Sequence, residues 1–182
     1  MKRTQNQKGY TLLESIMFIA VITAVSIGIV KVVSSMLDRY KISRLTSQVA
    51  ELQKSINVRF AAAESYEKLN MGLLIEENLL PGDISVGSGG GVRHKFNGLV
   101  QVNAVLSGRA YQIRFTKLPK QPCVELAIQN WAHDQYSNLI FMKVNGVPAK
   151  WRNATYIMPL SVVQAETLCH DELNNEITWR FQ

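Results

Sequence analysis

The stretch QKGYTLLESIMFIAVITAVSIGIVK, residues 7–31, holds a long apolar run with one carboxylate inside it. Between Leu12 and Val30 only Glu14 is charged, and the hydroxyl side chains in the run are small enough to hydrogen-bond to the carbonyls of their own helix. A helix of about 20 apolar residues crosses the hydrocarbon of a membrane. The run therefore predicts a membrane-spanning helix, and the basic residues before Gly9 place the N-terminus on the cytoplasmic side.

The helical pattern continues beyond this apolar run. No proline occurs before Pro81, and an apolar stripe follows at spacings of three and four residues: Leu45, Val49, Leu52, Ile56 and Phe60. We predict one continuous helix over residues 10–63, apolar all round in its first part (10–33) and one-sided in its second. A cleaved secretory signal would explain the basic front and the apolar run, but not the stripe that follows.

Composition and charge indicate a folded chain and give little support for a nucleic-acid partner. The 182 residues leave room for one domain and an appendage, with 47% hydrophobic and 19% charged residues. The net charge of +6 includes three basic residues before Gly9, which are Lys2, Arg3 and Lys8. Without them, 17 basic residues face 14 acidic ones and the net charge falls to +3. We therefore expect no nucleic-acid partner.

The region around Gly9 carries a combination of features that resembles a known family. A short basic leader ends in Gly9, an aromatic residue (Tyr10) follows, and Glu14 is the fifth residue after the junction at the head of the apolar helix. This combination resembles the N-terminus of type IV pilins and their pseudopilin relatives. The resemblance implies that a prepilin peptidase removes residues 1–9, that it cuts between Gly9 and Tyr10, and that Tyr10 is then N-methylated.

The resemblance also implies an assembly role for Glu14. Cleavage after Gly9 creates an α-amino group on Tyr10, which pairs with Glu14 of a neighbouring subunit. An unpaired charge in apolar surroundings costs several kcal/mol, so this pairing would fix the axial register of the subunits. In the alternative interpretation, Glu14 only reaches the lipid headgroups from the helix end.

The C-terminal part alternates strand and helix patterns. Residues 64–98 form a connecting region with a short helix at 71–79 and a glycine-rich loop, and residues 99–182 form a globular domain. Strand patterns occupy 99–105, 110–118, 138–146 and 176–181, and helical patterns occupy 122–134 and 161–171. This order predicts an α+β domain whose antiparallel sheet packs on the one-sided half of the long helix, as in the pilin fold.

The two cysteines, Cys123 and Cys169, have different meanings in different compartments. They would be two buried thiols in a cytosolic protein and one disulfide in an exported one. The C-terminal half resembles type IVb pilins, in particular those of conjugative-plasmid thin pili and bundle-forming pili. This resemblance implies a Cys123–Cys169 disulfide that bounds the region 123–169.

No catalytic, metal or cofactor site is expected. Nucleophile-elbow, phosphate-loop and zinc-protease motifs are absent from the sequence, and its three histidines lie far apart: His94, His133 and His170. The pair His133–Asp134 fits a solvated helix end, and the sequon at Asn153 fits a loop. We expect the three tryptophans to be core or interface anchors: Trp131, Trp151 and Trp179.

The functional expectation follows from the resemblance. It implies the structural subunit of a type IVb-like pilus, a helical homo-oligomer that serves adhesion, aggregation or mating contact. The precursor would sit in the inner membrane with its assembly machinery, and the filament would lie at the cell surface. Three alternatives remain: a minor pilin, a type II secretion pseudopilin, and a membrane-anchored periplasmic binding module that does not polymerise. The Gly9–Tyr10 junction and Glu14 favour a polymerising subunit, since a simple anchor needs neither.

Overall fold

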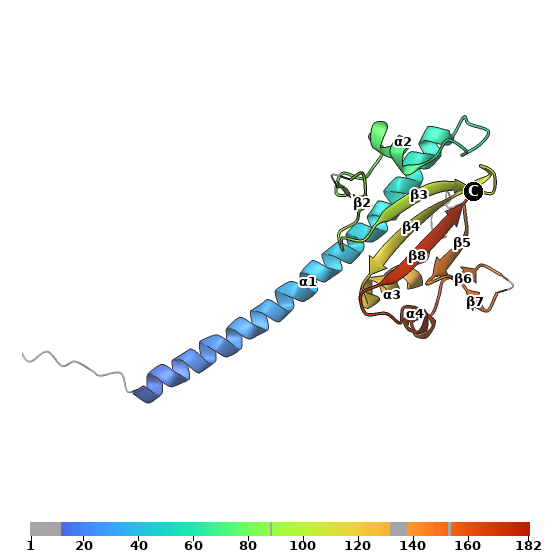
Figure 1. Cartoon of the computed structure of the whole chain (residues 1–182). Coiled ribbons are helices and arrows are strands. Elements are labelled where there is room, and N and C mark those ends of the chain that lie inside the picture. The colour runs from blue at the N-terminus through green and yellow to red at the C-terminus, as the bar shows by residue number, and fades with distance from the viewer. Residues whose placement is uncertain (1–11, 88, 132–137, 153) are drawn as a thin grey trace, which may run out of the picture. The chain divides into compact units, whose positions relative to one another are not determined.

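The computed structural model describes residues 12–87, 89–131, 138–152 and 154–182 (Figure 1). The chain divides into two compact units, residues 1–40 and 41–182. The first helix, α1 (Leu12–Phe60), begins in the first unit and ends in the second. It lies within the predicted helix 10–63 and ends three residues earlier than expected.

In the first unit, α1 satisfies its polar side chains locally. The hydroxyl of Thr23 donates to the carbonyl of Ile19, and that of Ser26 donates to the carbonyl of Ile22, both at 2.8 Å. These bonds remove the cost of placing hydroxyls among apolar side chains. Among the residues that the structure describes, no helix meets the length and apolarity expected of a membrane span.

The second unit is built on a six-stranded sheet (Figure 1). The strands run in the order β3 (Val100–Val105), β4 (Ala110–Leu118), β8 (Asn175–Phe181), β5 (Leu139–Val144), β6 (Val147–Lys150) and β7 (Tyr156–Ile157). All pairs are antiparallel except β6 and β7, which are parallel. The predicted α+β fold with a long helix packed on a largely antiparallel sheet is confirmed. The C-terminal strand β8 lies between β4 and β5.

The described residues of this unit also form three short helices and a small hairpin. They are α2 (Met71–Glu76), the hairpin β1 (Ser85–Val86) and β2 (Val92–Arg93), α3 (Lys120–Ile128) and α4 (Val162–Leu168). The hairpin flanks the glycine-rich loop and was not predicted. Helix α3 ends at Ile128, so the expected continuation to residue 134 is wrong. The start of α4 is fixed by a capping box, in which the side chains of Ser161 and Gln164 each bind the other's backbone N–H.

The core of the second unit lies between α1 and one face of the sheet. The predicted stripe is confirmed, because Leu45, Val49, Leu52 and Ile56 are completely buried. They belong to the same apolar cluster as the inward residues of β4 and β8, namely Tyr111, Ile113, Phe115, Ile177 and Trp179. In Figure 1 the teal end of α1 passes behind β3 and β4. Successive side chains of a strand point to opposite faces of its sheet. The residues that alternate with these core residues therefore lie on the face turned away from α1.

The turn between β5 and β6 follows from its Asn-Gly sequence. Asn145 and Gly146 have φ angles of 48° and 83°, as the tight turns preferred by hairpins require. The sequence predicted this turn but not the strand β6 that follows it.

Candidate functional site

The predicted processing and pairing residues fall mostly outside the described part of the chain. Gly9 and Tyr10 precede it, and the side chain of Glu14 is also outside it. The backbone of Glu14 belongs to the first turn of α1. The cleavage site, the N-methylation and the Tyr10–Glu14 pair therefore stay predictions.

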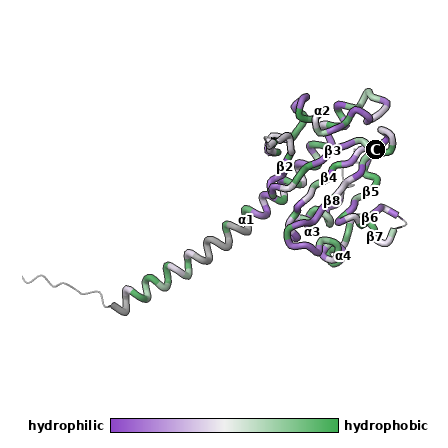
Figure 2. Tube along the Cα trace, viewed as in Figure 1, coloured by the Kyte–Doolittle hydropathy of each residue, from purple (hydrophilic) through white to green (hydrophobic). Residues whose placement is uncertain are grey.

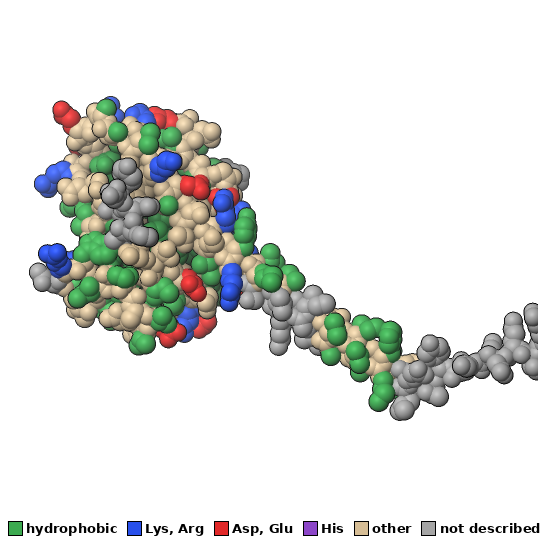
Figure 3. Space-filling view, turned by 180° about the vertical axis from the view of Figure 1, so that it is seen from behind, with side chains coloured by type: hydrophobic (Ala, Val, Ile, Leu, Met, Phe, Trp, Pro, Cys, Tyr) green, Lys and Arg blue, Asp and Glu red, His purple; other side chains and the backbone are tan. Residues whose placement is uncertain are grey.

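The described side chains that follow Glu14 form a continuous apolar surface. Green segments in the N-terminal part of α1 mark it in Figure 2, and Figure 3 shows the same side chains exposed. Its members range from 50% exposure at Ile22 to 68% at Phe18: Ile16, Met17, Phe18, Ile19, Val21, Ile22 and Val25. Successive helix positions differ by about 100° in direction, so these residues cover the whole circumference. A surface of this kind requires lipid or other protein around it.

The disulfide-bounded region is closed as expected. Cys123 in α3 and Cys169 at the end of α4 form a disulfide, with their Cα atoms 5.9 Å apart. Both cysteines are completely buried and belong to the apolar core. The bridge fixes α3 against α4 on the core side of the sheet.

Two asparagines extend this fixed region to the start of β8. The side-chain amide of Asn145 donates to the carbonyl of Leu168 and to Oδ1 of Asn175, both at 2.8 Å. The completely buried Asn175 donates in turn to the carbonyl of Leu118 at 3.1 Å. These bonds join α4, β8 and the end of β4. Sequence reasoning missed this network, because it recognised Asn145 only as a turn residue.

The tryptophans act as anchors, as expected. The rings of Trp131 and Trp179 meet edge to face with their centroids 5.2 Å apart. The indole N–H of Trp131 donates to the carbonyl of Leu126 at 3.0 Å, and that of Trp151 donates to the carbonyl of Leu139 at 2.9 Å. Trp179 lies in the core, and the partly buried Trp131 and Trp151 pack against it.

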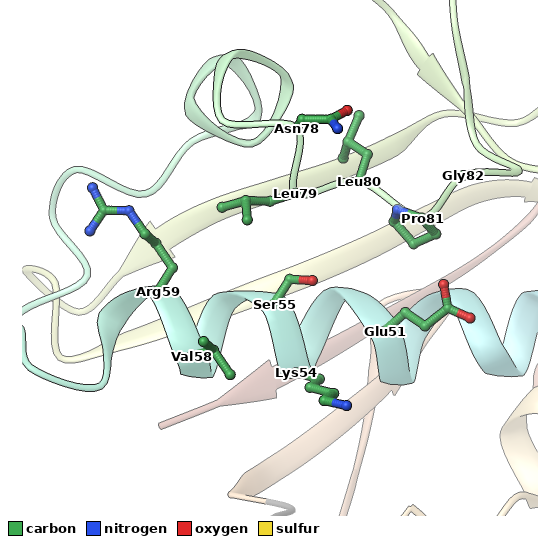
Figure 4. A pocket seen from close by; sticks show the side chains of 10 residues that line it. All are labelled: Glu51, Lys54, Ser55, Val58, Arg59, Asn78, Leu79, Leu80, Pro81 and Gly82. Carbon is green, nitrogen blue, oxygen red and sulfur yellow. The ribbon is translucent and has the colours of Figure 1, made fainter.

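An open groove of about 520 Å³ runs between α1 and the loop that follows α2 (Figure 4). On the helix side it is lined by Glu51, Lys54, Ser55, Val58 and Arg59, and on the loop side by residues 78–82. The Arg59 guanidinium binds the carboxylate of Glu77 with its Nη2 at 2.9 Å, which lowers the pKa of Glu77 and raises that of Arg59. The Arg59–Glu77 ion pair therefore joins α1 to the end of α2 beside the groove.

Of the two histidines that the structure describes, His94 has a well-defined structural environment. His94 is buried against Phe115, with its Nε2 2.9 Å from the carbonyl of Thr116. Its Nδ1 accepts a hydrogen bond from the N–H of Phe96 at 3.2 Å, so Nε2 carries the proton and donates to Thr116. Burial lowers the pKa of His94. His133, Asp134 and Asn153 lie outside the described residues. Within the described part of the chain, His, Cys, Asp and Glu side chains form no group that would hold a metal.

Comparison with known families gives a match that extends from α1 to the C-terminus. A family model described as "PilS N terminal" matches residues 39–182. The chain belongs to the PilS family. The family consists of structural pilins rather than enzymes, and the expectation of a type IVb-like pilin is confirmed.

Curated relatives and a solved structure resemble this PilS-family chain. The major structural subunit of bundle-forming pilus from Escherichia coli O127:H6 is 27% identical over 126 residues, as is that of Escherichia coli O111:H-. The matched segment covers 68% of this chain and 65% of each relative, just under two thirds of their length. The crystal structure of TcpA, a type IV pilin from Vibrio cholerae El Tor biotype, has a TM-score of 0.55 at 10% identity. That alignment covers 79% of this chain and 99% of TcpA, which confirms the pilin fold.

Proposed function

We propose that the chain is the structural subunit of a type IVb-like pilus, a filament of identical subunits. The observation that carries the proposal is the exposed apolar surface of residues 16–25 in α1. The same chain continues into the disulfide-closed unit of residues 41–182, which we call the pilin domain. An apolar helix that is exposed on all sides is stable in lipid or inside a bundle of similar helices. The pilin domain has its own core and would remain folded in either state.

The proposal includes a membrane-held precursor. In it, residues 10–33 lie in the inner membrane with the leader 1–9 on the cytoplasmic side, and a prepilin peptidase cuts between Gly9 and Tyr10. The assembly machinery then moves the helix from lipid into the filament core, and the filament reaches the cell surface. The basic leader, the apolar run and the family membership support this sequence of events.

The pairing of Glu14 with the Tyr10 α-amino group is the step that makes assembly specific. A carboxylate and an ammonium buried together are far more stable than either alone, so subunits would join in one register. Replacing Glu14 by glutamine removes the charge and keeps the size. It leaves the ammonium uncompensated, at a cost of about 3–5 kcal/mol.

The test compares Glu14→Gln with Glu64→Gln, a matched change of an exposed glutamate in the pilin domain. We expect both variants to be processed, as shown by a gel shift and by mass spectrometry of an N-methylated Tyr10. Electron microscopy should find filaments for Glu64→Gln and few or none for Glu14→Gln. Normal filaments from Glu14→Gln would refute the pairing. A mature N-terminus at Met1, or one beyond Ser26, would refute the processing.

A further inference from the structure

The sheet face turned away from α1 carries four cations from four strands, and we call it the cationic sheet face. Its cations are Arg114 on β4, Lys143 on β5, Lys150 on β6 and Arg180 on β8. The strand register places them on one side, because directly opposite residues share a face. A first row of residues across the strands contains Lys150, Phe141 and Arg180, each opposite the next. In the second row, Lys143 and Arg114 both lie opposite Thr178.

Neutral polar side chains complete the two rows of this face. The first row continues from Arg180 to Gln112 and Asn103, and the second continues from Arg114 to Gln101. Glu176 is the acidic residue among these strands, and it forms an ion pair with Arg114. The face therefore combines a net positive charge with amide groups that both donate and accept hydrogen bonds.

Phe141 holds two of the cations in position. The guanidinium of Arg180 lies over the Phe141 ring at 4.6 Å from its centroid, and the ammonium of Lys143 lies 5.6 Å from the same centroid. Cations fixed by a ring lose little side-chain entropy when they bind a ligand, and a guanidinium binds a carboxylate through two parallel N–H groups.

The spacing of the cations identifies the polymer that fits. Neighbouring strands lie about 4.8 Å apart, so Lys150 and Arg180, two strands apart, are separated by ~10 Å along their row. Lys143 and Arg114 are also two strands apart in the second row. Two linked sugar rings span a comparable length, whereas duplex DNA carries one charge per ~1.7 Å. Arg180 and Lys143 lie over the Phe141 ring, so little of the ring is open for a nucleic-acid base to stack on it.

We propose that the cationic sheet face binds an acidic polysaccharide with one carboxylate on every second sugar, lying across the strands. Carboxylates meet Lys150 and Arg180 in the first row and Lys143 in the second, where Arg114 is already paired with Glu176. The sugar hydroxyls meet the amides of Gln101, Asn103 and Gln112. This binding activity goes beyond a role as a filament subunit. It does not require polymerisation, since the face is complete in one chain.

The test measures binding of hyaluronan, which has one carboxylate per disaccharide, to the full-length mature chain in a non-ionic detergent. Neutral dextran and duplex DNA of similar length serve as comparison polymers. The test variant is Lys143→Gln with Lys150→Gln. The matched control, Lys54→Gln with Lys68→Gln, removes the same charge from α1 and from the segment before α2. The conservative variant Lys143→Arg with Lys150→Arg keeps the charge of the face.

We expect the test variant to bind hyaluronan at least about tenfold more weakly than the unchanged chain, while the control loses less than about twofold. The arginine variant should bind normally. Equal losses in the test and control variants would show attraction to net charge alone and would overturn the proposal. Binding of dextran as tight as that of hyaluronan, or tighter binding of DNA, would also overturn it. Filament formation by the same variants, scored separately by electron microscopy, tests the pilus function, so the two proposals can fail independently.

Discussion

Removal of the Cys123–Cys169 disulfide should destabilise the pilin domain by about 4 kcal/mol. The bridge joins cysteines with a sequence separation of 46. In the chain-entropy relation for disulfides, closing a loop of this length in the unfolded chain corresponds to about 4 kcal/mol at room temperature. Both cysteines are completely buried, so Cys123→Ala with Cys169→Ala also removes two sulfur atoms from the core and adds to the loss.

Urea unfolding in a non-ionic detergent, followed by tryptophan fluorescence, measures this loss. Trp131 and Trp179 are in ring contact within the core of the domain, so their emission reports its unfolding. For a domain of this size the midpoint should fall by about 2 M urea. The unchanged protein treated with a reductant provides the control, because it loses the bridge and keeps the sulfur atoms. Reductant should lower its midpoint and leave that of the double variant unchanged. Equal midpoints for the oxidised protein and the double variant would refute the reasoning.

Three further changes have expected outcomes in the same urea assay. Burial lowers the pKa of His94, so the unfolded state binds the proton first as the pH falls below about 6.5. The midpoint should therefore be lower at pH 5 than at pH 7.5, and His94→Gln should reduce this difference. A Cβ on Gly98 would overlap the carbonyl oxygen of Thr116, so Gly98→Ala should lower the free energy of unfolding by at least about 2 kcal/mol. In the control Gly82→Ala the new Cβ meets open space, and the free energy of unfolding should change by less than about 0.5 kcal/mol. Asn175→Ala should cost about 2–4 kcal/mol, because it leaves buried partners of its amide unpaired.

Local patterns predicted the elements that depend on local chemistry. The alternation of residues 110–118 gave β4 with its bounds, since one face of that strand is buried and the other is not. The stripe that begins at Leu45 gave the buried side of α1, and Asn145–Gly146 gave a turn that needs positive φ at both positions. Each of these signals arises from residues within a few positions of one another.

Pairing between distant strands was not predicted. Strand β8 was expected from its own pattern, but its place between β4 and β5 follows from pairing across a long stretch of chain. The strands β1, β2 and β7 have two residues each, too few to show a period. Helix α3 ends early, and Trp131 folds back so that its indole donates to Leu126. An extended helical pattern does not reveal such a contact.

The candidate sites divide in the same way. The predicted processing motif around Gly9 and Glu14 is contiguous, so it could be proposed from the sequence, and it stays a prediction. The cations of the cationic sheet face lie on four strands between residues 114 and 180, and only the register of β4, β8, β5 and β6 makes them neighbours. Their distribution in the sequence resembles that of ordinary surface charges, so it carried no signal.

Stability and assembly should be separable properties of this chain, because they depend on different residues. The buried core residues of the described chain begin at Leu45, so the pilin domain owes its stability to residues 41–182. The exposed apolar side chains before Tyr40 leave water only when lipid or other helices cover them, so they favour membrane insertion and assembly. Changes at the disulfide or at Asn175 should therefore lower the unfolding midpoint. Changes at Glu14 should leave the midpoint unaltered and abolish filaments, and a variant that loses both properties together would contradict this division.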